Sequence, residues 1–329
     1  MQTTTLGRTG LDVSRIVLGT WQFSGKWGEF DPDTATKIIR EAFDRGINFF
    51  DTAYAYGFGR AERVLGEALA DPLRTNRDDV VVATKGGVRR TDEGTHVRDS
   101  SPAFLRHGLE ESLRSLNVDH VDILLVHWPD DETPIAETAG CVGDFITEGK
   151  VRFAGVSNYD VAQMEAFSRT TPVSVLQPPY SLLRRGADEE ILPYCRDRDI
   201  GTFVYGTLAH GLLSGKYDAD SSFPSEDWRS SSPVFQGDSF TRNVEVAARL
   251  RAYAEQLAIS LPELVVAWAL HRPGVDCAIV GGRSLDQVEA AARMSDIRLT
   301  DDQLHDIEAI AADGTSVGGP APEAGGIDE

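Results

Sequence analysis

The sequence predicts one (β/α)₈ barrel with an N-terminal β-hairpin and extra C-terminal helices. First, eight short apolar segments, typical of buried strands, alternate with helical segments along the chain. Second, the length of 329 residues is normal for a single barrel of this kind. Third, no G-x-G-x-x-G turn follows the first barrel strand, which argues against the main rival, a doubly wound open sheet.

Turn signals place the hairpin before the barrel. Residues 3–6 and 11–14 flank a turn at 7–10 that contains two glycines and a threonine. The apolar run at 15–19 then predicts the first barrel strand, which ends at Thr20.

A cap signal and an apolar run predict the first helix and the second strand. Asp31 can cap a helix with a proline in its first turn, and that helix should continue to about residue 46. The run at 47–50 reads as a buried strand that ends at the acid Asp51. A turn-rich, aromatic segment follows, and a helix should begin near Arg60.

The same alternation continues to residue 280. Each further strand is a short apolar run bounded by turn residues, and the helices between them show caps or an apolar face. The predicted strands are 80–85, 121–127, 151–156, 173–176, 200–204 and 277–280, and the predicted helices are 102–117, a helix ending near 148, 189–198, 243–258 and 261–271.

Two segments do not fit this alternation. Residues 209–240 contain Ser and Pro clusters and are too long for an ordinary connection, so they predict a functional loop. Residues 313–329 are rich in Gly, Pro and acids, which predicts a disordered tail. The expected organisation is therefore a single barrel domain over residues 1–312, followed by this tail.

Composition excludes several classes of function. A formal net charge of −20 leaves too few basic groups to bind nucleic acid or an anionic membrane. No apolar run approaches the roughly 20 residues that a membrane span needs, and the N-terminus lacks the pattern of a signal peptide. Cys141, Cys195 and Cys277 are scattered, without metal-ligand spacing. We therefore expect a cytoplasmic protein with reduced thiols and no metal site.

The basic residues are unevenly divided, with five Lys and 27 Arg. An acidic surface with little lysine is one way to remain soluble in high salt, where self-repulsion is screened. A halophilic source is thus one hypothesis, and an ordinary acidic bacterial enzyme is the other. Activity and stability that do not improve between low and molar salt would count against the first.

Polar and aromatic residues follow the strands. In a closed barrel the carboxyl ends of all strands meet at one mouth, where active sites of this fold lie. Stability alone does not explain why so many apolar strands end this way. In strand order these residues are Trp21, Asp51 with Tyr56, Lys85, His127, Ser157 with Asn158, Gln177, Tyr205, and Gly281 with Arg283.

Four of these residues suggest proton transfer coupled to hydride transfer. A free tyrosine has a pKa of ~10, and a buried Lys85 ammonium beside Tyr56 would favour the phenolate. Asp51 could keep that lysine charged, and a neutral His127 could donate a hydrogen bond to a carbonyl oxygen. Taken singly, each residue is more often a structural ion pair or a rim residue. Their position at the ends of three consecutive strands favours the catalytic interpretation.

Six motifs together resemble the aldo-keto reductase superfamily, in the expected order and over about residues 3–312. They are D-T-A-x-x-Y-G-x-G at 51–59, A-T-K-G-G at 83–87, L-L-V-H-W-P-D at 124–130, G-V-S-N at 155–158, L-Q-P-P-Y-S-L-L at 176–183 and G-L-L-S-G-K-Y at 211–217. The chain is most similar to the bacterial and archaeal branch that includes the inositol-operon and general-stress oxidoreductases. The resemblance implies that Asp51, Tyr56, Lys85 and His127 are a catalytic tetrad, with Tyr56 as the general acid.

The resemblance also implies that NADP(H) lies across the barrel mouth. Ser157, Asn158 and Gln177 would hold the nicotinamide carboxamide, Tyr205 would stack on the ring, and Arg283 would meet the 2′-phosphate. A guanidinium suits a phosphate, so NADPH is expected over NADH. The full implied set for the cofactor is Thr20, Trp21, Asp51, Ser157, Asn158, Gln177, Tyr205, Thr207, Leu208, Gly211, Ser214, Lys216, Gly281, Arg283 and Gln287.

The expected substrate is a small carbonyl compound or polyol, including sugar-like carbonyls, held against an aromatic wall. The alternative for each aromatic is a half-buried packing residue. The residues assigned to substrate are Trp21, Phe23, Trp27, Tyr56, His127 and Trp128, with Trp228 and Phe235 as weaker candidates.

Two other functions compete with an oxidoreductase. Potassium-channel β subunits resemble the same superfamily and keep the tetrad, so a regulatory subunit that holds NADP(H) with little turnover is one alternative. A barrel isomerase or aldolase with Lys85 as a Schiff base is the other, although Asp51 argues against it because such a lysine needs an apolar pocket. The sequence indicates no oligomeric state, reaction direction or physiological substrate.

Overall fold

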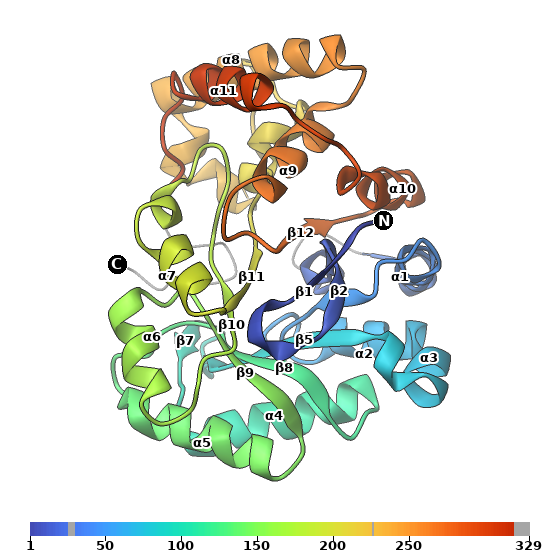
Figure 1. The fold of residues 1–329 in the computed structure, drawn as a ribbon, viewed down its shortest axis with the longest axis vertical. Coiled ribbons are helices and arrows are strands. Elements are labelled where there is room, and N and C mark those ends of the chain that lie inside the picture. Colours follow the sequence, from blue (N-terminus) through green and yellow to red (C-terminus); the bar gives the residue numbers. More distant parts are fainter. Residues whose placement is uncertain (26–29, 226, 319–329) are drawn as a thin grey trace.

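The computed structural model describes residues 1–25, 30–225 and 227–318. Its centre is a closed barrel of eight strands in the order β10-β11-β12-β3-β4-β5-β8-β9, with every neighbouring pair parallel (Figure 1). The predicted (β/α)₈ fold is therefore confirmed. The barrel strands are β3 (Ile16–Gly19), β4 (Phe49–Asp51), β5 (Val81–Gly86), β8 (Val121–Val126), β9 (Val151–Ser157), β10 (Val175–Gln177), β11 (Gly201–Val204) and β12 (Cys277–Gly281).

Helices surround the barrel, and α8 and α11 lie together beyond α9 (Figure 1). Proline in the first turn and a side-chain cap define the start of α1, α4 and α9, as the sequence predicts for the first two. The helices are α1 (Pro32–Asp44), α2 (Arg60–Ala68), α3 (Ala70–Thr75), α4 (Pro102–Leu116), α5 (Ile135–Thr147), α6 (Val161–Ser168), α7 (Ile191–Asp197), α8 (Gly237–Gln256), α9 (Leu261–Leu270), α10 (Leu285–Met294) and α11 (Asp301–Ala311).

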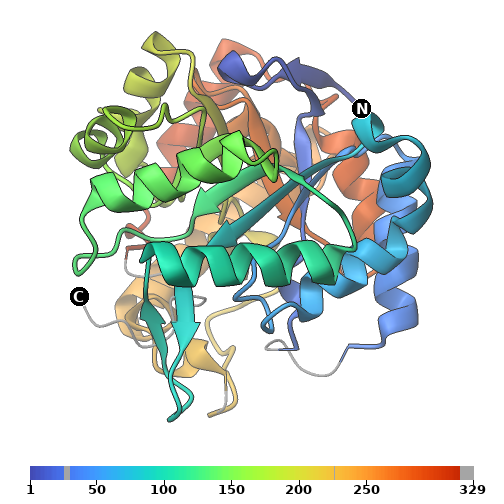
Figure 2. The same cartoon turned by 90° about the horizontal axis from the view of Figure 1, so that it is seen from below.

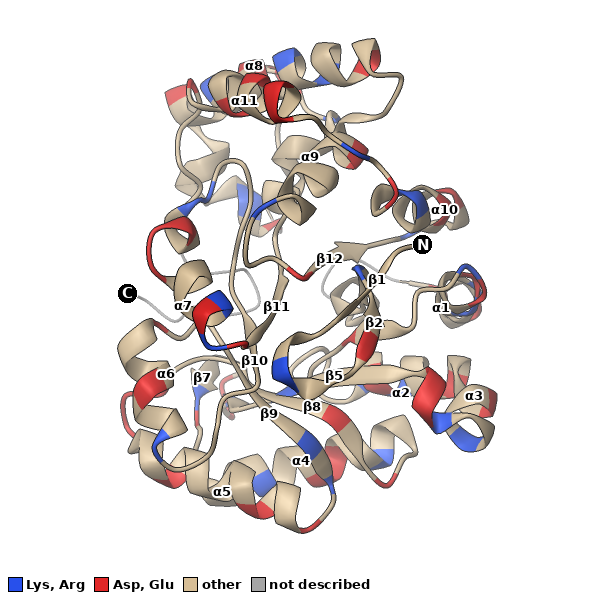
Figure 3. Cartoon of the chain, in the orientation of Figure 1, with Lys and Arg blue, Asp and Glu red and all other residues tan. Residues whose placement is uncertain are grey.

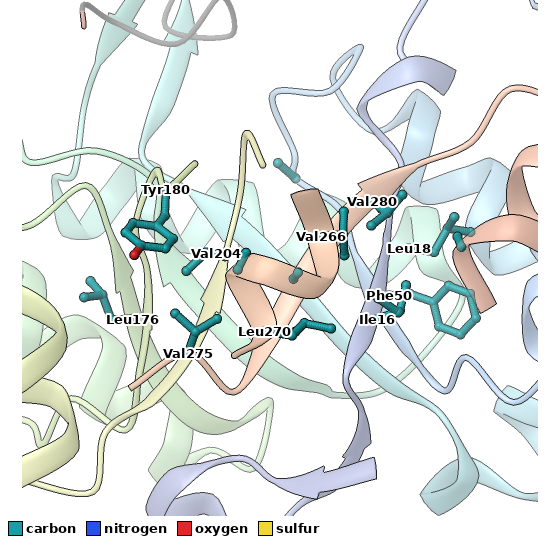
Figure 4. Packing of buried hydrophobic residues seen from close by; sticks show 14 of the residues in the cluster. Ile16, Leu18, Phe50, Leu176, Tyr180, Val204, Val266, Leu270, Val275 and Val280 are labelled. Carbon is teal, nitrogen blue, oxygen red and sulfur yellow. The ribbon is translucent and has the colours of Figure 1, made fainter. Parts of the chain in front are cut away.

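The strand side chains alternate between two apolar layers, because successive residues of a strand point to opposite faces. Val17, Phe49 and Phe203 belong to a cluster inside the barrel, where the two phenylalanine rings lie 5.0 Å apart. Ile16 and Phe50 belong instead to the layer between strands and helices. Figure 4 shows part of that layer, with Val266 and Leu270 of α9 among outward side chains such as Val204 and Val280.

The predicted N-terminal hairpin closes one end of the barrel. Its strands, β1 (Thr3–Thr5) and β2 (Asp12–Ser14), pair in antiparallel fashion, and Leu6 and Val13 join the interior cluster. Gly7 has a φ of 44°, and a Cβ at this position would lie 2.2 Å from the backbone nitrogen of Gly201. Only glycine permits so close an approach between the hairpin and β11.

A second hairpin, which the sequence does not predict, projects from the opposite end. It consists of β6 (Val88–Arg90) and β7 (His96–Arg98) between β5 and α4. Figure 2 shows this hairpin (teal) on the side away from the N-terminal hairpin (dark blue) and on the same side as much of the segment 209–240 (yellow to orange). Its strands have three residues each and are rich in arginine, so they lack the apolar run that signals a strand.

The segment 209–240 is shorter as a loop than predicted. Helix α8 begins at Gly237, six residues before the predicted start at 243, and its N-cap position, Gln236, makes no capping hydrogen bond. Burial of Phe240 in the core explains the earlier start, since packing supplies what a cap would otherwise supply. Three 3₁₀ turns precede the helix: η5 (Ala209–Ser214), η6 (Trp228–Ser230) and η7 (Pro233–Phe235).

The predicted tail starts with residues that pack on the barrel. Val317 is buried, and its backbone nitrogen donates a hydrogen bond of 2.7 Å to the carbonyl oxygen of Leu183. The nitrogen of Thr315 donates to Oδ1 of Asn243 on α8. Residues 313–318 are therefore held in place, whereas the rest of the predicted disordered segment, 319–329, lies outside the described residues. The division into a domain over 1–312 and a tail stays a prediction.

Charged residues belong mainly to the helices and loops, and few of them belong to the barrel strands (Figure 3). Among the described residues, no helix combines the length and apolar character that crossing a membrane requires. Two of the few charges on the barrel strands, Asp51 and Lys85, lie near the carboxyl ends of β4 and β5, at the mouth of the barrel. The other two, Asp122 and Arg152, pair with each other near the amino ends of β8 and β9.

Candidate active site

On five barrel strands the inward face carries apolar residues inside the barrel, and a polar residue follows at the mouth. On β5, Val81 and Ala83 belong to the interior cluster, so Lys85 is the next inward position. By the same alternation Asp51 follows Phe49 on β4, and Gln177 follows Val175 on β10. His127 likewise follows Ile123 and Leu125, and Tyr205 follows Phe203. Strand periodicity thus brings these side chains to one place.

A buried ion pair lies at the centre of this group. Lys85 Nζ donates to both carboxylate oxygens of Asp51, at 2.8 and 2.7 Å, and to the carbonyl oxygen of Thr52 at 2.9 Å. It also donates to the hydroxyl oxygen of Tyr56 at 3.2 Å. Burial raises the pKa of the Asp51 carboxyl, while the Lys85 ammonium and the Gln177 amide act in the opposite direction. The ammonium therefore connects the carboxylate to the phenol.

His127 lies against the Tyr56 ring, with ring centroids 5.9 Å apart and planes at 76°. Burial lowers the pKa of His127 well below its ordinary value, and the charges of Lys85 and His96 lower it further. The imidazole is therefore neutral at physiological pH. Its Nδ1 is buried without a hydrogen-bond partner among the described residues, which leaves Nε2 as the nitrogen available to a ligand.

A second hydrogen-bonded chain connects β9, β10 and β11. Gln177 Nε2 donates to Oδ1 of Asp51 at 2.7 Å, and Ser157 Oγ donates to the carbonyl oxygen of Gln177 at 2.9 Å. Asn158 Nδ2 donates to Ser157 Oγ, and the Tyr205 hydroxyl donates to Oδ1 of Asn158 at 2.8 Å. The residues expected at the nicotinamide are therefore physically joined to the ion pair.

A cleft of about 180 Å³ opens beside the ion pair. Eight residues of the expected cofactor set line it: Trp21, Asp51, Gln177, Tyr205, Thr207, Leu208, Gly211 and Gly281. Tyr56 lines it as well, together with residues that the sequence reasoning missed, namely Gly19, Gln22, Gly206, His210, Ile279 and Val280. Gln22 carries no chemical motif, and its amide bridges the carbonyl oxygens of Gly19 and Gly282 at 2.7 and 3.2 Å.

The remaining expected cofactor residues lie outside the lining of this cleft. Thr20 is buried, and its hydroxyl donates to the carbonyl oxygen of Asp51 at 3.1 Å. Ser214 Oγ donates to the carbonyl oxygen of Gly211 at 2.6 Å, and it accepts from the nitrogen of Lys216. Both residues therefore support the cleft walls, and Lys216 lies at the end of the same turn.

The turn after Leu208 is strained. Ala209, His210 and Gly211 all have positive φ, at 48°, 56° and 98°, a conformation that is costly for the first two. His210 packs edge-on against Trp228 of η6 at 5.2 Å. Burial lowers the pKa of His210 to about 4, helped by two nearby arginines, so this ring is also neutral.

Arg283 and Gln287 lie at the start of α10. The backbone nitrogen of Arg283 donates to Oε1 of Gln287 at 2.7 Å, and Ser284 caps the helix. Arg283 therefore directly precedes the capping residue of α10. Its guanidinium lies 5.9 Å from the Phe30 ring and makes no ion pair with a described residue.

The aromatic residues assigned to substrate lie in different places. Trp21 lines the cleft, and Trp128 packs with Ala55 and Val88 next to Tyr205. Phe23 is only 2% exposed and packs against Phe30 in the core, so it is a packing residue and not part of the described cleft. Trp27 lies outside the described residues. Trp228 reaches the cleft only through its contact with His210.

The β6–β7 hairpin supplies further residues at the mouth. His96 is buried and packs edge-on against Phe58 at 5.6 Å. The Arg98 guanidinium lies 5.1 Å above the Trp128 ring. No motif in the sequence signals these residues, and only the arginine-rich composition of 88–98 could have drawn attention to them.

Comparison with known proteins agrees with this geometry. Residues 15–312 match the model of the aldo/keto reductase family. The chain is an aldo-keto reductase. This confirms the resemblance seen in the sequence motifs, whereas the closer relation to the inositol-operon branch stays a prediction.

Relatives of this aldo-keto reductase include both enzymes and channel subunits. The Bacillus subtilis aldo-keto reductase YhdN is 37% identical over 312 residues, which are 94% of this chain and 93% of that protein. The Escherichia coli NADH-specific methylglyoxal reductase is 30% identical over 90% and 94% of the two chains. A probable voltage-gated potassium channel β subunit from Oryza sativa is 33% identical over 94% and 96%.

A solved structure is similar as well. The glycerol dehydrogenase of Gluconobacter oxydans superposes with a TM-score of 0.85 at 37% identity, over 92% of each chain. Together these comparisons place this aldo-keto reductase in a family of oxidoreductases that act on carbonyl and alcohol groups.

Proposed function

We propose that this aldo-keto reductase interconverts aldehydes or ketones and alcohols with NADP(H), and that Tyr56 is the general acid and base. The observation that carries this proposal is the contact of 3.2 Å between Lys85 Nζ and the Tyr56 hydroxyl, beside a neutral His127. The substrate class is a small carbonyl compound or polyol.

The residues present suit a nicotinamide cofactor. Among the described residues, none donates a hydrogen bond to Oε1 of Gln177, so this acceptor is available to the amino group of a carboxamide. Tyr205 offers a ring face at the cleft, and Gly206 has open space where a side chain would stand. When bound, the nicotinamide would supply or accept the hydride.

The protein residues would manage the proton and the charge. In reduction the Tyr56 hydroxyl gives its proton to the carbonyl oxygen, and the Lys85 ammonium stabilises the phenolate that remains. Asp51 compensates the charge of that buried ammonium through an ion pair of 2.7 Å. His127 Nε2, as a neutral donor, binds the same oxygen and orients it toward Tyr56. Oxidation of an alcohol uses the same groups in reverse.

A preference for NADPH rests on Arg283. A guanidinium without a carboxylate partner among the described residues can bind a 2′-phosphate with two parallel hydrogen bonds. The relative that is specific for NADH argues for measuring both cofactors, since family membership alone does not decide between them.

The similarity to a plant potassium-channel β subunit favours a second candidate, a binding subunit that holds NADP(H) with little turnover. A panel of aldehydes and ketones, followed by NADPH absorbance, separates the two functions. We expect turnover that falls about 10²–10⁴-fold in Tyr56→Phe, with cofactor binding retained. A fully active Tyr56→Phe enzyme would remove the proposed acid, and tight cofactor binding without turnover would favour the binding subunit.

A further inference from the structure

The inward face of the β6–β7 hairpin gathers positive charge at the mouth. In this antiparallel pair Val88 lies opposite Arg98, and Arg90 lies opposite His96. Directly opposed residues and residues two apart on a strand share a face of the hairpin. Val88 packs in the cluster that contains Trp128. The face that carries Val88, Arg90, His96 and Arg98 is therefore the one turned toward the active site.

The two arginines of this face, Arg90 and Arg98, have no carboxylate partner among the described residues. Arg98 donates only a long hydrogen bond of 3.4 Å to the carbonyl oxygen of Pro129, and its Nε is buried without a partner among the described residues. By contrast, Arg89 on the outer face pairs with Asp99 at 3.0 Å. The unpaired cations are thus confined to the inward side.

A cleft of about 450 Å³ lies beside this face. Arg90, Thr95 and His96 line it from the hairpin, and Arg60 lines it from α2, three residues after Gly57. A Cβ on Gly25 would lie 2.5 Å from Nη1 of Arg60, so this guanidinium lies over the glycine. Arg60 likewise has no ion pair with a described residue.

This cleft is connected to the catalytic residues by two consecutive residues of the chain. Gly57, in its lining, directly follows Tyr56, which lines the cofactor cleft. The Arg98 guanidinium lies over the ring of Trp128, the residue that directly follows His127. A substrate with its carbonyl at Tyr56 and a chain of a few carbons would therefore extend toward these arginines.

The chemistry of this face favours an anion, and in particular a phosphate ester. The chain carries a net charge of −20, so an anionic substrate meets repulsion over most of the surface. Asp92 and Glu93, in the exposed hairpin turn, pair with none of these arginines. Guanidinium groups from two elements can contact several oxygens of one dianion, whereas a carboxylate is satisfied by a single arginine.

Building on the proposed carbonyl–alcohol chemistry, we propose that the inward face of the β6–β7 hairpin, together with Arg60, binds a phosphate group at the far end of the substrate. The enzyme then selects phosphorylated hydroxycarbonyl compounds, or the corresponding polyol phosphates, over their unphosphorylated forms.

The test compares kcat/KM for glyceraldehyde 3-phosphate with kcat/KM for glyceraldehyde. Glyceraldehyde has no phosphate, so it reports the carbonyl reaction without the proposed phosphate contact. We expect kcat/KM to be at least tenfold higher for the phosphate ester. Arg90→Gln and Arg98→Lys should each lower this ratio about tenfold, and Arg60→Gln should lower it as well. The matched control is Arg89→Gln, on the other face of the same strand, which should leave the ratio unchanged. Equal ratios in all variants, or a preference for glyceraldehyde, would overturn the proposal.

Two further experiments distinguish failure of the phosphate site from failure of the proposed function. Glucuronate, which ends in a carboxylate, should gain less than twofold in kcat/KM over glucose, and a gain equal to that of the phosphate ester would contradict the choice of phosphate. The second experiment uses the Arg283→Ala protein, so that the proposed 2′-phosphate site does not contribute. Inorganic phosphate should raise the melting temperature of that protein and of its Arg89→Gln variant, but not of its Arg60→Gln/Arg90→Gln variant. Stabilisation by phosphate does not depend on turnover. If phosphate stabilises the protein but no carbonyl compound is reduced, only the proposed function is contradicted. If phosphate does not stabilise the protein, the proposed phosphate site is contradicted.

Discussion

The Thr84 hydroxyl donates a hydrogen bond of 2.6 Å to Oε1 of Glu62, directly behind the residue that carries the catalytic ammonium. Thr84 is the outward neighbour of Lys85 on β5, and Glu62 is completely buried on α2. Burial raises the pKa of Glu62 to about 7, although the hydrogen bonds to it and the Lys85 charge act against this. A carboxyl that titrates near neutral pH therefore supports the strand beneath the active site.

Glu62→Gln should stabilise the protein at high pH. The folded pKa of about 7 exceeds the ordinary value of 4.5, so the stability contributed by the protonated carboxyl is fully present below pH 4.5 and is lost as the pH rises through 7. The loss amounts to about 3 kcal/mol, at 1.36 kcal/mol per pKa unit. Urea unfolding at pH 5 and pH 8 measures it. A difference between wild type and variant that does not grow with pH would contradict the buried titration.

Removing one charge of the Asp51–Lys85 ion pair should destabilise the protein more than removing both charges. Asp51→Asn leaves the Lys85 ammonium buried without a carboxylate, at a cost of about 3–5 kcal/mol. The double variant Asp51→Asn/Lys85→Met removes both charges and should recover much of that stability while remaining inactive. Denaturant unfolding and carbonyl reduction are measured on the same three proteins. A double variant no more stable than Asp51→Asn would speak against a buried uncompensated charge.

His127 should act as a neutral hydrogen-bond donor. His127→Gln keeps an amide donor and should retain more activity than His127→Phe, for which we expect a loss of about 10²–10³ in kcat. The pKa of His127 is lowered below its unfolded value, so the wild type should lose stability relative to His127→Gln as the pH falls below about 6.5. Equal activities of the two variants would exclude hydrogen bonding by this residue.

Arg283→Ala should reduce the preference for NADPH. Loss of a charged pair to a phosphate changes affinity by about tenfold for each 1.4 kcal/mol, so the NADPH/NADH ratio of kcat/KM should fall by one to two orders of magnitude. Arg293→Ala is the control, because Arg293 lies on α10, which begins just after Arg283, and is paired with Glu289. An unchanged ratio in Arg283→Ala would remove the role assigned to this guanidinium.

The positions of the central site residues follow from the sequence because strand periodicity determines them. Once 81–86 is a strand with Val81 and Ala83 inside the barrel, Lys85 must also point inward, and the same holds for Asp51 after Phe49. Their roles stay predictions, but their meeting at one mouth required only the barrel and the alternation. The hydrogen bonds of Asn158 do not follow from periodicity, because Asn158 lies beyond the end of β9 with a φ of 63° and its partner Tyr205 follows β11, two strands away.

Features governed by tertiary packing could not be predicted in this way. The sequence predicts Phe23 as part of an aromatic wall around the substrate, yet its side chain is buried in the core and packs against Phe30. The β6–β7 hairpin has strands of three residues without an apolar run, and contacts with Phe58 and Trp128 hold it in place. The early start of α8 depends on burial of Phe240, which no local cap signals.

The β6–β7 hairpin contributes no strand to the barrel sheet, and both of its ends return to rigid elements, β5 and α4. Its loss or replacement would leave the eight-stranded hydrogen-bond ladder intact. With the proposed phosphate site, substrate choice would depend on an element outside the barrel sheet, so exchanging the hairpin residues 88–98 offers a way to change that choice while the strands keep their pairing.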